Sequence, residues 1–336
     1  MKKYIDVRKE YIDVMKGIGI ILVVIGHTGN SFSGWIYSFH MGLFFWIAGY
    51  TMALKPLPET KIFLKKRIKS IIFPLIGFWV VSVLNQYIII KKYNLNFEWF
   101  DYVKGLILGG HWLEITGNFP LWFLHLLFIA EILFYLELKF LPTYFVAING
   151  IIIALGTLKF QEIFPGRPIW HINVLPVALV YMTIGFYTYK ILKEKTGSIL
   201  YGIVLIMIGW HMTLTWGGNV AQINTYWYYV ESFLSIMGIY IIARNINVKF
   251  LNRIGKMSLY IMGIHALIMN FAGQFVQYIF DTIEFSSEFI RHMCAAGITV
   301  LLSCAISNIY LDIKNVIKYK VAIKNKVRYR LVIINE

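Results

Sequence analysis

The stretch "KGIGIILVVIGH", residues 16–27, is a long apolar run with a polar group at each end. Lys16 and His27 are separated by ten uncharged residues. On an α-helix this spacing is about three full turns, which places both side chains on one face, about 16 Å apart along the axis. A long apolar helix needs neither a cation nor an imidazole. The two ends therefore mark a candidate functional site.

The composition indicates a membrane protein. Of the 336 residues, 58% are hydrophobic and 15% are charged, and the mean hydropathy is +0.65. Soluble domains carry about 25% charged residues, so one soluble core cannot hide this many apolar side chains. The net charge of +15 lies in loops between apolar runs, which favours membrane topology over nucleic-acid binding. Cys294 and Cys304 give neither a disulfide framework nor zinc-ligand spacing, and no metal is expected.

Ten segments of about twenty mostly apolar residues predict spanning helices. They cover residues 14–31, 35–54, 70–90, 119–138, 141–159, 169–189, 198–216, 226–243, 257–280 and 289–310. A tight turn around Asn30–Gly34 joins the first two, and residues 91–118 have room for a re-entrant or interfacial piece. The expected fold class is therefore all-α. We predict a polytopic membrane bundle of about ten helices, with residues 1–336 forming a single domain.

The distribution of Lys and Arg predicts the orientation of the chain. With the N-terminus inside, the cytoplasmic pieces carry 26 of the 32 cations and the outer pieces carry six. Cytoplasmic loops of membrane proteins are enriched in Lys and Arg, so both termini are expected inside. Two interpretations suit the basic cytoplasmic tail, residues 311–336: it lies on the anionic inner leaflet, or it is an ordinary positive-inside anchor.

Ionisable side chains within the spans are functional candidates, because Asp, Lys or Arg at bilayer depth costs at least about 2.5–3.5 kcal/mol. His27 lies about 15 Å into the first span, near the midplane, and His40 lies close to the outer end of the second. The short turn makes these helices antiparallel neighbours, so both imidazoles can face one cavity. The alternative is a plain hydrogen bond between the helices. Glu131 is interpreted as a structural partner of another polar side chain.

A cluster of cations lies at the cytoplasmic ends of the spans. The stretch "FLKKRIKSIIFP", residues 63–74, places Lys and Arg side chains just before the third span. The positive-inside rule accounts for most of them. Lys16 and Arg67, however, head spans of one compact group below His27, where cations suit a phosphorylated ligand entering from the cytoplasm. Three arrangements are open for Asp13: it holds Lys16, it pairs with Arg67, or it forms a plain surface pair.

These stretches resemble the acyltransferase-3 family of integral membrane acyltransferases, particularly the fucose 4-O-acetylase-like group of polysaccharide O-acetyltransferases. The similarity begins with "YIDVMKGIGIILVVIGH" (11–27) and "IYSFHMGLFFWIAGY" (36–50). It resumes at residues 63–74 and at "PLWFLHLLFIAEI" (120–132), and it ends with "IGKMSLYIMGIHALI" (254–268). It covers nearly the whole chain, and the first two stretches together carry most of its specificity.

The resemblance implies transfer of an acyl group, usually acetyl from acetyl-CoA, to a hydroxyl of an envelope carbohydrate, in the bacterial cytoplasmic membrane. Family members commonly carry a basic residue, most often Arg, then ten residues, then His. Lys16 and His27 fill these positions, and Lys keeps the charge but not the planar fork of Arg. The same matching makes His27 and His40 the catalytic candidates. The candidates for substrate binding are Lys16, Arg67, Asp13, Trp122 and His265.

One mechanism fits these positions. The phosphates of acyl-CoA lie near Lys16 and Arg67, and neutral His27 takes the proton of an acceptor hydroxyl as its oxygen attacks the thioester carbonyl. Three roles stay open for His40: it orients His27, binds the sugar, or stabilises the oxyanion. The alternative is a covalent route with the acyl group held on a side chain, although no nucleophile-elbow pattern supports it.

Two other classes of function stay open. A polar-lined bundle could flip or export a lipid-linked or polymeric sugar without acyl transfer, although transporters often show duplicated halves and no duplication is detected here. A non-catalytic membrane partner of a polysaccharide synthase would not need the His27–His40 pair. The expected partners are the lipid bilayer, acetyl-CoA and a carbohydrate acceptor, with no nucleic acid.

Overall fold

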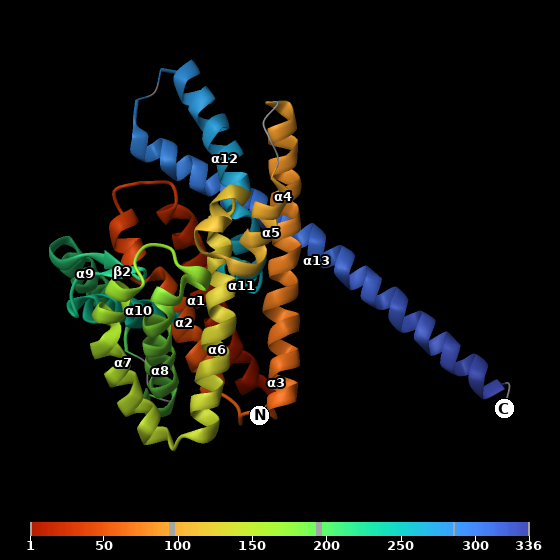
Figure 1. Ribbon diagram of the computed structural model, residues 1–336, viewed down its shortest axis with the longest axis horizontal. Coiled ribbons are helices and arrows are strands. Elements are labelled where there is room, and N and C mark those ends of the chain that lie inside the picture. Colours follow the sequence, from red (N-terminus) through yellow and green to blue (C-terminus); the bar gives the residue numbers. More distant parts are fainter. Residues whose placement is uncertain (1, 94–97, 193–196, 285, 335–336) are drawn as a thin grey trace.

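Helices form almost the whole chain in this computed structural model, which describes residues 2–93, 98–192, 197–284 and 286–334. Figure 1 shows many of the long helices standing side by side as a bundle, while the last helix crosses the bundle and leaves it. The elements are α1 (Lys2–Gly26), α2 (Ser33–Ala53), α3 (Thr60–Arg67), η1 (Ile68–Ile72), α4 (Phe73–Lys92), α5 (Trp99–Leu108), η2 (Gly110–Thr116), η3 (Phe119–Leu121), α6 (Trp122–Phe140), α7 (Thr143–Ile163), η4 (Ile169–Val174), α8 (Leu175–Leu192), α9 (Ile199–Trp216), β1 (Gly218–Asn219), β2 (Gln222–Ile223), α10 (Trp227–Asn245), α11 (Lys249–Lys256), α12 (Ser258–Thr282) and α13 (Glu288–Ile334). The two strands form a short antiparallel hairpin.

Each of the ten segments expected to span the membrane contains a helix, so the all-α class is confirmed. Seven helical stretches of the described residues are long and apolar enough to cross a membrane: Thr60–Lys92, Phe119–Phe140, Thr143–Ile163, Ile169–Leu192, Ile199–Trp216, Ser258–Thr282 and Glu288–Val316. The other three expected spans, α1, α2 and α10, do not meet that measure. Helix α2 packs against α1, α8, α9 and α10, so its side chains face protein and need not be uniformly apolar.

The outward faces of the bundle are apolar. On α4, α7 and α9 the side chains of Leu84, Ile88, Ile151, Leu155 and Leu200 are each more than half exposed. Exposed apolar side chains of this size are unfavourable in water and favourable against lipid tails. The arrangement of apolar side chains outside and polar groups inside is that of a multi-pass membrane protein.

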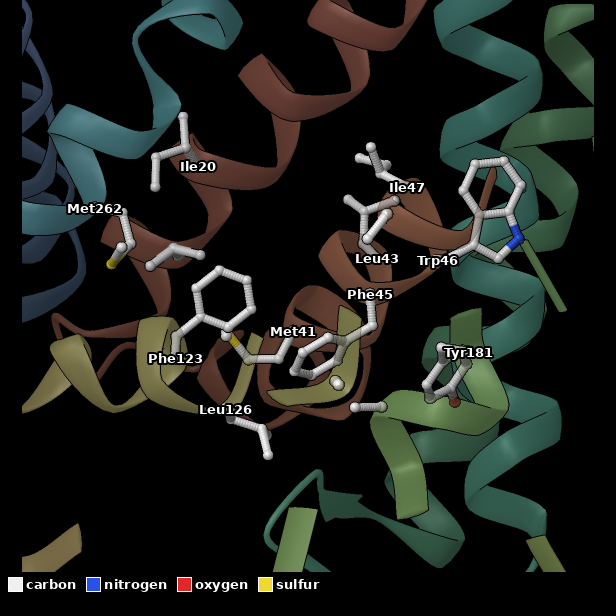
Figure 2. Close-up of a cluster of buried hydrophobic side chains, with 14 of the residues drawn as sticks. Ile20, Met41, Leu43, Phe45, Trp46, Ile47, Phe123, Leu126, Tyr181 and Met262 are labelled. Atoms are coloured by element: carbon white, nitrogen blue, oxygen red, sulfur yellow. The ribbon is translucent and has the colours of Figure 1, made fainter. Parts of the chain in front are cut away.

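The centre of the bundle is packed closely around α2. A Cβ atom built on Gly49 of α2 would stand 1.9 Å from the Met182 carbonyl oxygen, and one built on Gly185 of α8 would stand 2.1 Å from the Trp46 carbonyl oxygen. Small residues allow helix backbones in membranes to approach this closely. Figure 2 shows the apolar side chains that several helices contribute to this core. This tight packing holds α2 in place, and α2 carries several residues of the site described below.

The third span contains a widened helical turn. Helix α3 continues through η1, a π-helical turn, directly into α4. Pro74 lies in the first turn of α4, where its ring and its missing N–H disturb the backbone hydrogen bonds of the preceding turn. Single π turns inside α-helices are rare and are frequently found at functional sites. Arg67 and Ser70 lie at this turn.

Residues 98–118 fold onto the bundle as the short pieces α5 and η2. Trp79 of α4 donates its Nε1 hydrogen to the Tyr102 carbonyl at 2.9 Å. Asn118 donates to the Ser82 hydroxyl at 2.9 Å and to the Gly263 carbonyl at 2.8 Å. These contacts tie the connection to α4 and α12. The separate piece expected within residues 91–118 is therefore present, with residues 94–97 outside the described chain.

The basic tail, residues 311–336, is a continuation of the last helix. Helix α13 extends to Ile334, and in Figure 1 its blue end projects away from the bundle. A helix is compatible with both interpretations of the tail, so its place on the inner leaflet stays a prediction. The cytoplasmic location of both termini is likewise a prediction of the charge distribution.

Candidate active site

One large cavity, of about 1550 Å³, penetrates the bundle. Its lining comes from α1, α2, α3, η1, η2, η3, α6, α7, η4 and α12, from the loops beside them and from the hairpin β1–β2. Three kinds of polar group face it: cations from α1 and from the end of α3, imidazoles and a phenol from α2 and the turn before it, and a mixture of charged and amide side chains from the other lining segments. A concave, mostly apolar site with a few convergent polar groups is where ligand binding is expected in an otherwise apolar bundle.

Three histidines meet at one wall of this cavity. The His27 ring stacks on the His265 ring, with 5.3 Å between centroids and 10° between planes. The His40 ring meets His27 edge-on at 6.4 Å. His27 and His40 line the cavity, and His265 is fully buried. The predicted convergence of the first two histidines is therefore present, and α12 adds the third.

The turn between α1 and α2 places His27 opposite His40. Helix α1 ends at Gly26, not at residue 31 as expected, and the turn precedes Ser33. The reason is local: Asn30 donates its side-chain amide to the Ile25 carbonyl at 2.6 Å, and Ser33 donates its hydroxyl to the Gly26 carbonyl at 2.9 Å. Side chains thus satisfy the carbonyls that end the helix. His27 stands immediately after α1, with its ring turned back toward α2.

Backbone carbonyls fix the tautomers of two of the rings. His40 Nδ1 lies 2.7 Å from the Ile36 carbonyl oxygen, and His265 Nδ1 lies 2.8 Å from that of Met262. A carbonyl oxygen only accepts, so Nδ1 carries the hydrogen in both rings and Nε2 of the neutral imidazole is an acceptor. Neutral His40 therefore offers the cavity an acceptor and no donor, which argues against its role as an oxyanion stabiliser.

Tyr37 belongs to this group and was missed in the sequence. Its hydroxyl lies 3.0 Å from His27 Nδ1, and its ring centroid lies 5.3 Å from that of His40. Tyr37 stands three positions before His40 on α2 and so shares its helical face. The three-residue spacing from His40 could have indicated Tyr37 as a site residue. A tyrosine near the end of a span, however, is also typical of an interfacial anchor.

The first cation at the cavity is Lys16. Its Nζ lies 3.5 Å from Asp13 Oδ1, one turn earlier on α1. Of the three arrangements open for Asp13, the structure has the one in which it holds Lys16. Lys16 and His27 line the same cavity, as their shared helical face predicts, whereas Asp13 is not part of the lining. Asp13 therefore acts on the cavity through Lys16.

The second cation, Arg67, pairs with Glu131 of α6. Arg67 Nε lies 2.9 Å from Glu131 Oε2, and the side chains are 20% and 6% exposed. This ion pair gives Glu131 the structural partner expected from the sequence and excludes the alternative pairing of Arg67 with Asp13. Both members line the cavity. Because Nε holds the carboxylate, the terminal amino groups of the guanidinium are the part of Arg67 that a ligand can engage.

Trp122 marks another part of the cavity, nine residues before Glu131 and therefore about 14 Å away along α6. Its ring stacks on His171 of η4, with 4.8 Å between centroids and 28° between planes. Trp170 and His171 have φ values of 54° and 52°. This left-handed backbone costs residues other than glycine about 1–3 kcal/mol each. Trp170 is anchored by donating its Nε1 hydrogen to the Ile107 carbonyl at 2.6 Å.

The charges near Trp122 are paired with each other. Arg167 forms an ion pair with Glu114, and its guanidinium lies 4.4 Å from the centre of the Phe119 ring. All three residues line the cavity. The lining at this end therefore holds Arg167 together with Glu114 and Glu162, whereas the lining at the other end holds Lys16 and Arg67 together with Glu131.

The structure brings together most of the predicted site. Five of the seven candidates line this same cavity: Lys16, His27, His40, Arg67 and Trp122. The other two support lining residues, Asp13 through Lys16 and His265 through His27. Sequence reasoning singled out neither Tyr37 nor His171 as a site residue.

Comparisons with known proteins identify the family of the chain. No curated protein and no solved structure matches the chain. The family model for an acyltransferase domain matches residues 9–308, a range that includes all the site residues described above. The chain therefore belongs to the acyltransferase-3 family.

Proposed function

We propose that this multi-pass membrane acyltransferase moves an acetyl group from cytoplasmic acetyl-CoA to a hydroxyl of a cell-envelope polysaccharide or its lipid-linked precursor. The family supports acyl transfer in general, and the donor and acceptor are the proposal. One observation supports it best: a single cavity is lined by the cations Lys16 and Arg67 and by the group His27, Tyr37 and His40. The proposed location is the bacterial cytoplasmic membrane, with both termini inside.

The cationic end of the cavity suits the donor. CoA carries phosphate groups, for which arginine offers a planar fork and lysine a point charge. Glu131 holds Arg67 by Nε and so presents its terminal amino groups. Lys16 is about one-third exposed and lies on the α1 face that leads to His27. The donor binds with its phosphates between these cations and its thioester toward the imidazoles.

The acyl transfer is a direct displacement at the thioester. The acceptor oxygen attacks the carbonyl carbon, and Nε2 of neutral His27 takes the hydroxyl proton. The tetrahedral intermediate then collapses, the carbon–sulfur bond breaks, and His27 returns the proton to the sulfur of CoA. A positioned general base of this kind contributes about 10²–10⁴-fold to the rate.

Tyr37 and His40 have separate roles in this proposal. His27 donates its Nδ1 hydrogen to the Tyr37 hydroxyl, which lies 3.0 Å away, and this fixes Nε2 as the base. The hydroxyl hydrogen of Tyr37 is then free to point at the thioester oxygen as negative charge develops there. His40, with Nε2 as an acceptor, binds a hydroxyl of the acceptor sugar.

The test uses purified protein in nanodiscs with acetyl-CoA labelled in its acetyl group. The acceptor is the carbohydrate extracted from cells that lack the gene, treated with mild alkali to remove O-acetyl esters. We expect CoA release and label incorporation that both depend on the carbohydrate, and label that mild alkali removes. The absence of carbohydrate-dependent label from wild-type protein would contradict the proposed donor and acceptor.

The same preparation distinguishes transfer from transport. A flippase or exporter moves sugar without consuming acetyl-CoA, so CoA release would not respond to the carbohydrate. A covalent acyl-enzyme is distinguished by label that stays on the protein when the carbohydrate is omitted. Direct transfer predicts no such label after denaturation and gel filtration.

A further inference from the structure

The loop between α7 and α8 holds a histidine with unused bonding capacity. His171 is 2% exposed, and neither of its ring nitrogens has a hydrogen-bond partner among the described residues. It nevertheless lines the cavity. Buried polar groups are normally paired, because an unpaired one loses its bonds to water without replacement. An unpaired imidazole that faces a cavity is therefore suited to a ligand.

The chain holds His171 in place by several independent contacts. Its ring lies on the face of Trp122, and its backbone has a left-handed φ of 52°. Gln161 of α7 braces the same loop by donating to the Asn173 carbonyl at 3.2 Å and to the Val220 carbonyl at 2.9 Å. Strained residues persist only where their surroundings over-determine them, and they concentrate at ligand sites. The bracing fixes the direction in which the imidazole points.

A nearby histidine shows what a purely structural imidazole looks like in this fold. His125 is also buried, on the same helix as Trp122 and close to Trp170. Its Nε2 lies 2.8 Å from the Leu106 carbonyl and its Nδ1 lies 3.3 Å from the Leu121 carbonyl, and it does not line the cavity. His171 differs from His125 in both respects: its ring nitrogens have no hydrogen-bond partner among the described residues, and it lines the cavity.

The surroundings of His171 favour an uncharged, hydroxyl-rich ligand over a polyphosphate. Glu114 and Glu162 line this part of the cavity, and the nearby cation Arg167 is already paired with Glu114. Trp122 and the aromatic ring of Phe119 add apolar surface. Sugars combine apolar faces with hydroxyls that both donate and accept hydrogen bonds, which matches an aromatic wall beside a neutral imidazole.

We infer that His171, stacked on Trp122, binds the carbohydrate acceptor and determines its affinity, separately from the donor contacts at Lys16 and Arg67. This inference rests on the proposed acyl transfer to a carbohydrate. Because His171 binds substrate and takes no part in proton transfer, its loss raises the acceptor concentration needed for half-maximal rate. The acetyl-CoA concentration needed for half-maximal rate stays the same.

The test compares His171→Asn with wild type in nanodiscs, using labelled acetyl-CoA and the de-O-acetylated carbohydrate of the deletion strain as the acceptor. Asparagine tolerates the left-handed backbone, so the variant keeps the fold while it loses the imidazole. His171→Gly, which takes this backbone without strain, is the second variant. The matched control is His125→Asn.

We expect both His171 variants to raise the KM for the carbohydrate about tenfold or more, the effect of one lost hydrogen bond, with the KM for acetyl-CoA unchanged. The control His125→Asn should lower the melting temperature and change neither the KM for the carbohydrate nor the KM for acetyl-CoA. An unchanged acceptor KM, or an equal rise in both KM values, would overturn the inference while wild-type transfer persists. Absence of transfer by wild type would instead overturn the proposed function itself.

Discussion

The imidazole rings of His27 and His265 stack almost parallel, 10° apart, with 5.3 Å between their centroids. His27 immediately follows α1 and His265 lies on α12, far away in the sequence. His265 supports one face of the His27 ring, and the Tyr37 hydroxyl fixes its Nδ1 edge at 3.0 Å. Residues of two helices, α2 and α12, therefore position a single candidate base at the cavity wall.

Tyr37→Phe tests the contribution of the phenol hydroxyl, because the substitution keeps the ring. We expect kcat to fall about 10²–10³-fold, the effect of removing one donor to a developing oxyanion. The KM for acetyl-CoA should be unchanged, since Tyr37 is remote from the cations. Steady-state acetyl transfer in nanodiscs provides both constants.

Tyr229→Phe is the matched control. The Tyr229 hydroxyl lies 2.8 Å from the Thr157 hydroxyl, and the residue does not line the cavity. This variant should keep the wild-type kcat. Equal kcat values for Tyr37→Phe and wild type would show that the phenol has no part in the chemistry.

Arg67→Met separates the structural role of the ion pair from its role in binding the donor. The substitution leaves Glu131 buried without its counter-charge, which should lower the free energy of unfolding by about 3–5 kcal/mol. The double variant Arg67→Met/Glu131→Leu removes both charges and should recover most of that loss. Denaturant unfolding in detergent micelles measures these values.

The double variant should recover stability but not the binding of acetyl-CoA. In the double variant we expect the KM for acetyl-CoA to remain raised at least about tenfold, as for loss of a charged hydrogen bond. The KM for the carbohydrate should be that of wild type. Recovery of acetyl-CoA affinity together with stability would assign Arg67 to structure alone.

Gly49→Ala tests the close contact of α2 with α8. The new Cβ would stand 1.9 Å from the Met182 carbonyl oxygen, so the helices must separate. We expect a loss of about 1–3 kcal/mol in the free energy of unfolding, as for overpacking of a core. Gly156→Ala on α7 is the control, since its Cβ meets nothing within 4 Å. A helix-interior alanine there should be neutral or stabilising by up to about 1 kcal/mol.

The orientation in the membrane can be tested with single cysteines after Cys294 and Cys304 are replaced by alanine. Lys61→Cys lies in the segment predicted to be cytoplasmic, and Thr282→Cys lies at the predicted outer end of α12; both positions are exposed. A membrane-impermeant maleimide should label Thr282→Cys in intact cells and Lys61→Cys only after the membrane is broken. The reverse pattern would contradict the predicted topology.

Local signals in the sequence were sufficient for the architecture and for the first histidine pair. Apolar runs separated by loops indicate the helices, and the short turn after His27 requires α1 and α2 to be neighbours. The fixed spacing of Lys16 and His27 places both on one helical face, and both do line one cavity. The cation cluster before the third span added Arg67 to this set, and the resemblance to the acyltransferase-3 family added Trp122.

Contacts between distant segments could not be predicted in the same way. Arg67 and Glu131 pair across 64 positions, and only the packing of η1 on α6 brings them together. His171 depends on a left-handed backbone that no sequence pattern signals at a Trp-His pair. Helix α1 ends at Gly26, earlier than the apolar run predicts, because side chains of the turn bind its last carbonyls. Hydropathy alone does not predict such hydrogen bonds.

The role of His27 is tested most directly by the single-turnover rate of acetyl transfer from labelled acetyl-CoA to the de-O-acetylated carbohydrate, measured for wild type and for His27→Ala in nanodiscs. Removal of the base predicts a rate about 10²–10⁴-fold below that of wild type, with acetyl-CoA binding retained. A near wild-type rate for His27→Ala would contradict the assignment of the base and with it the proposed mechanism.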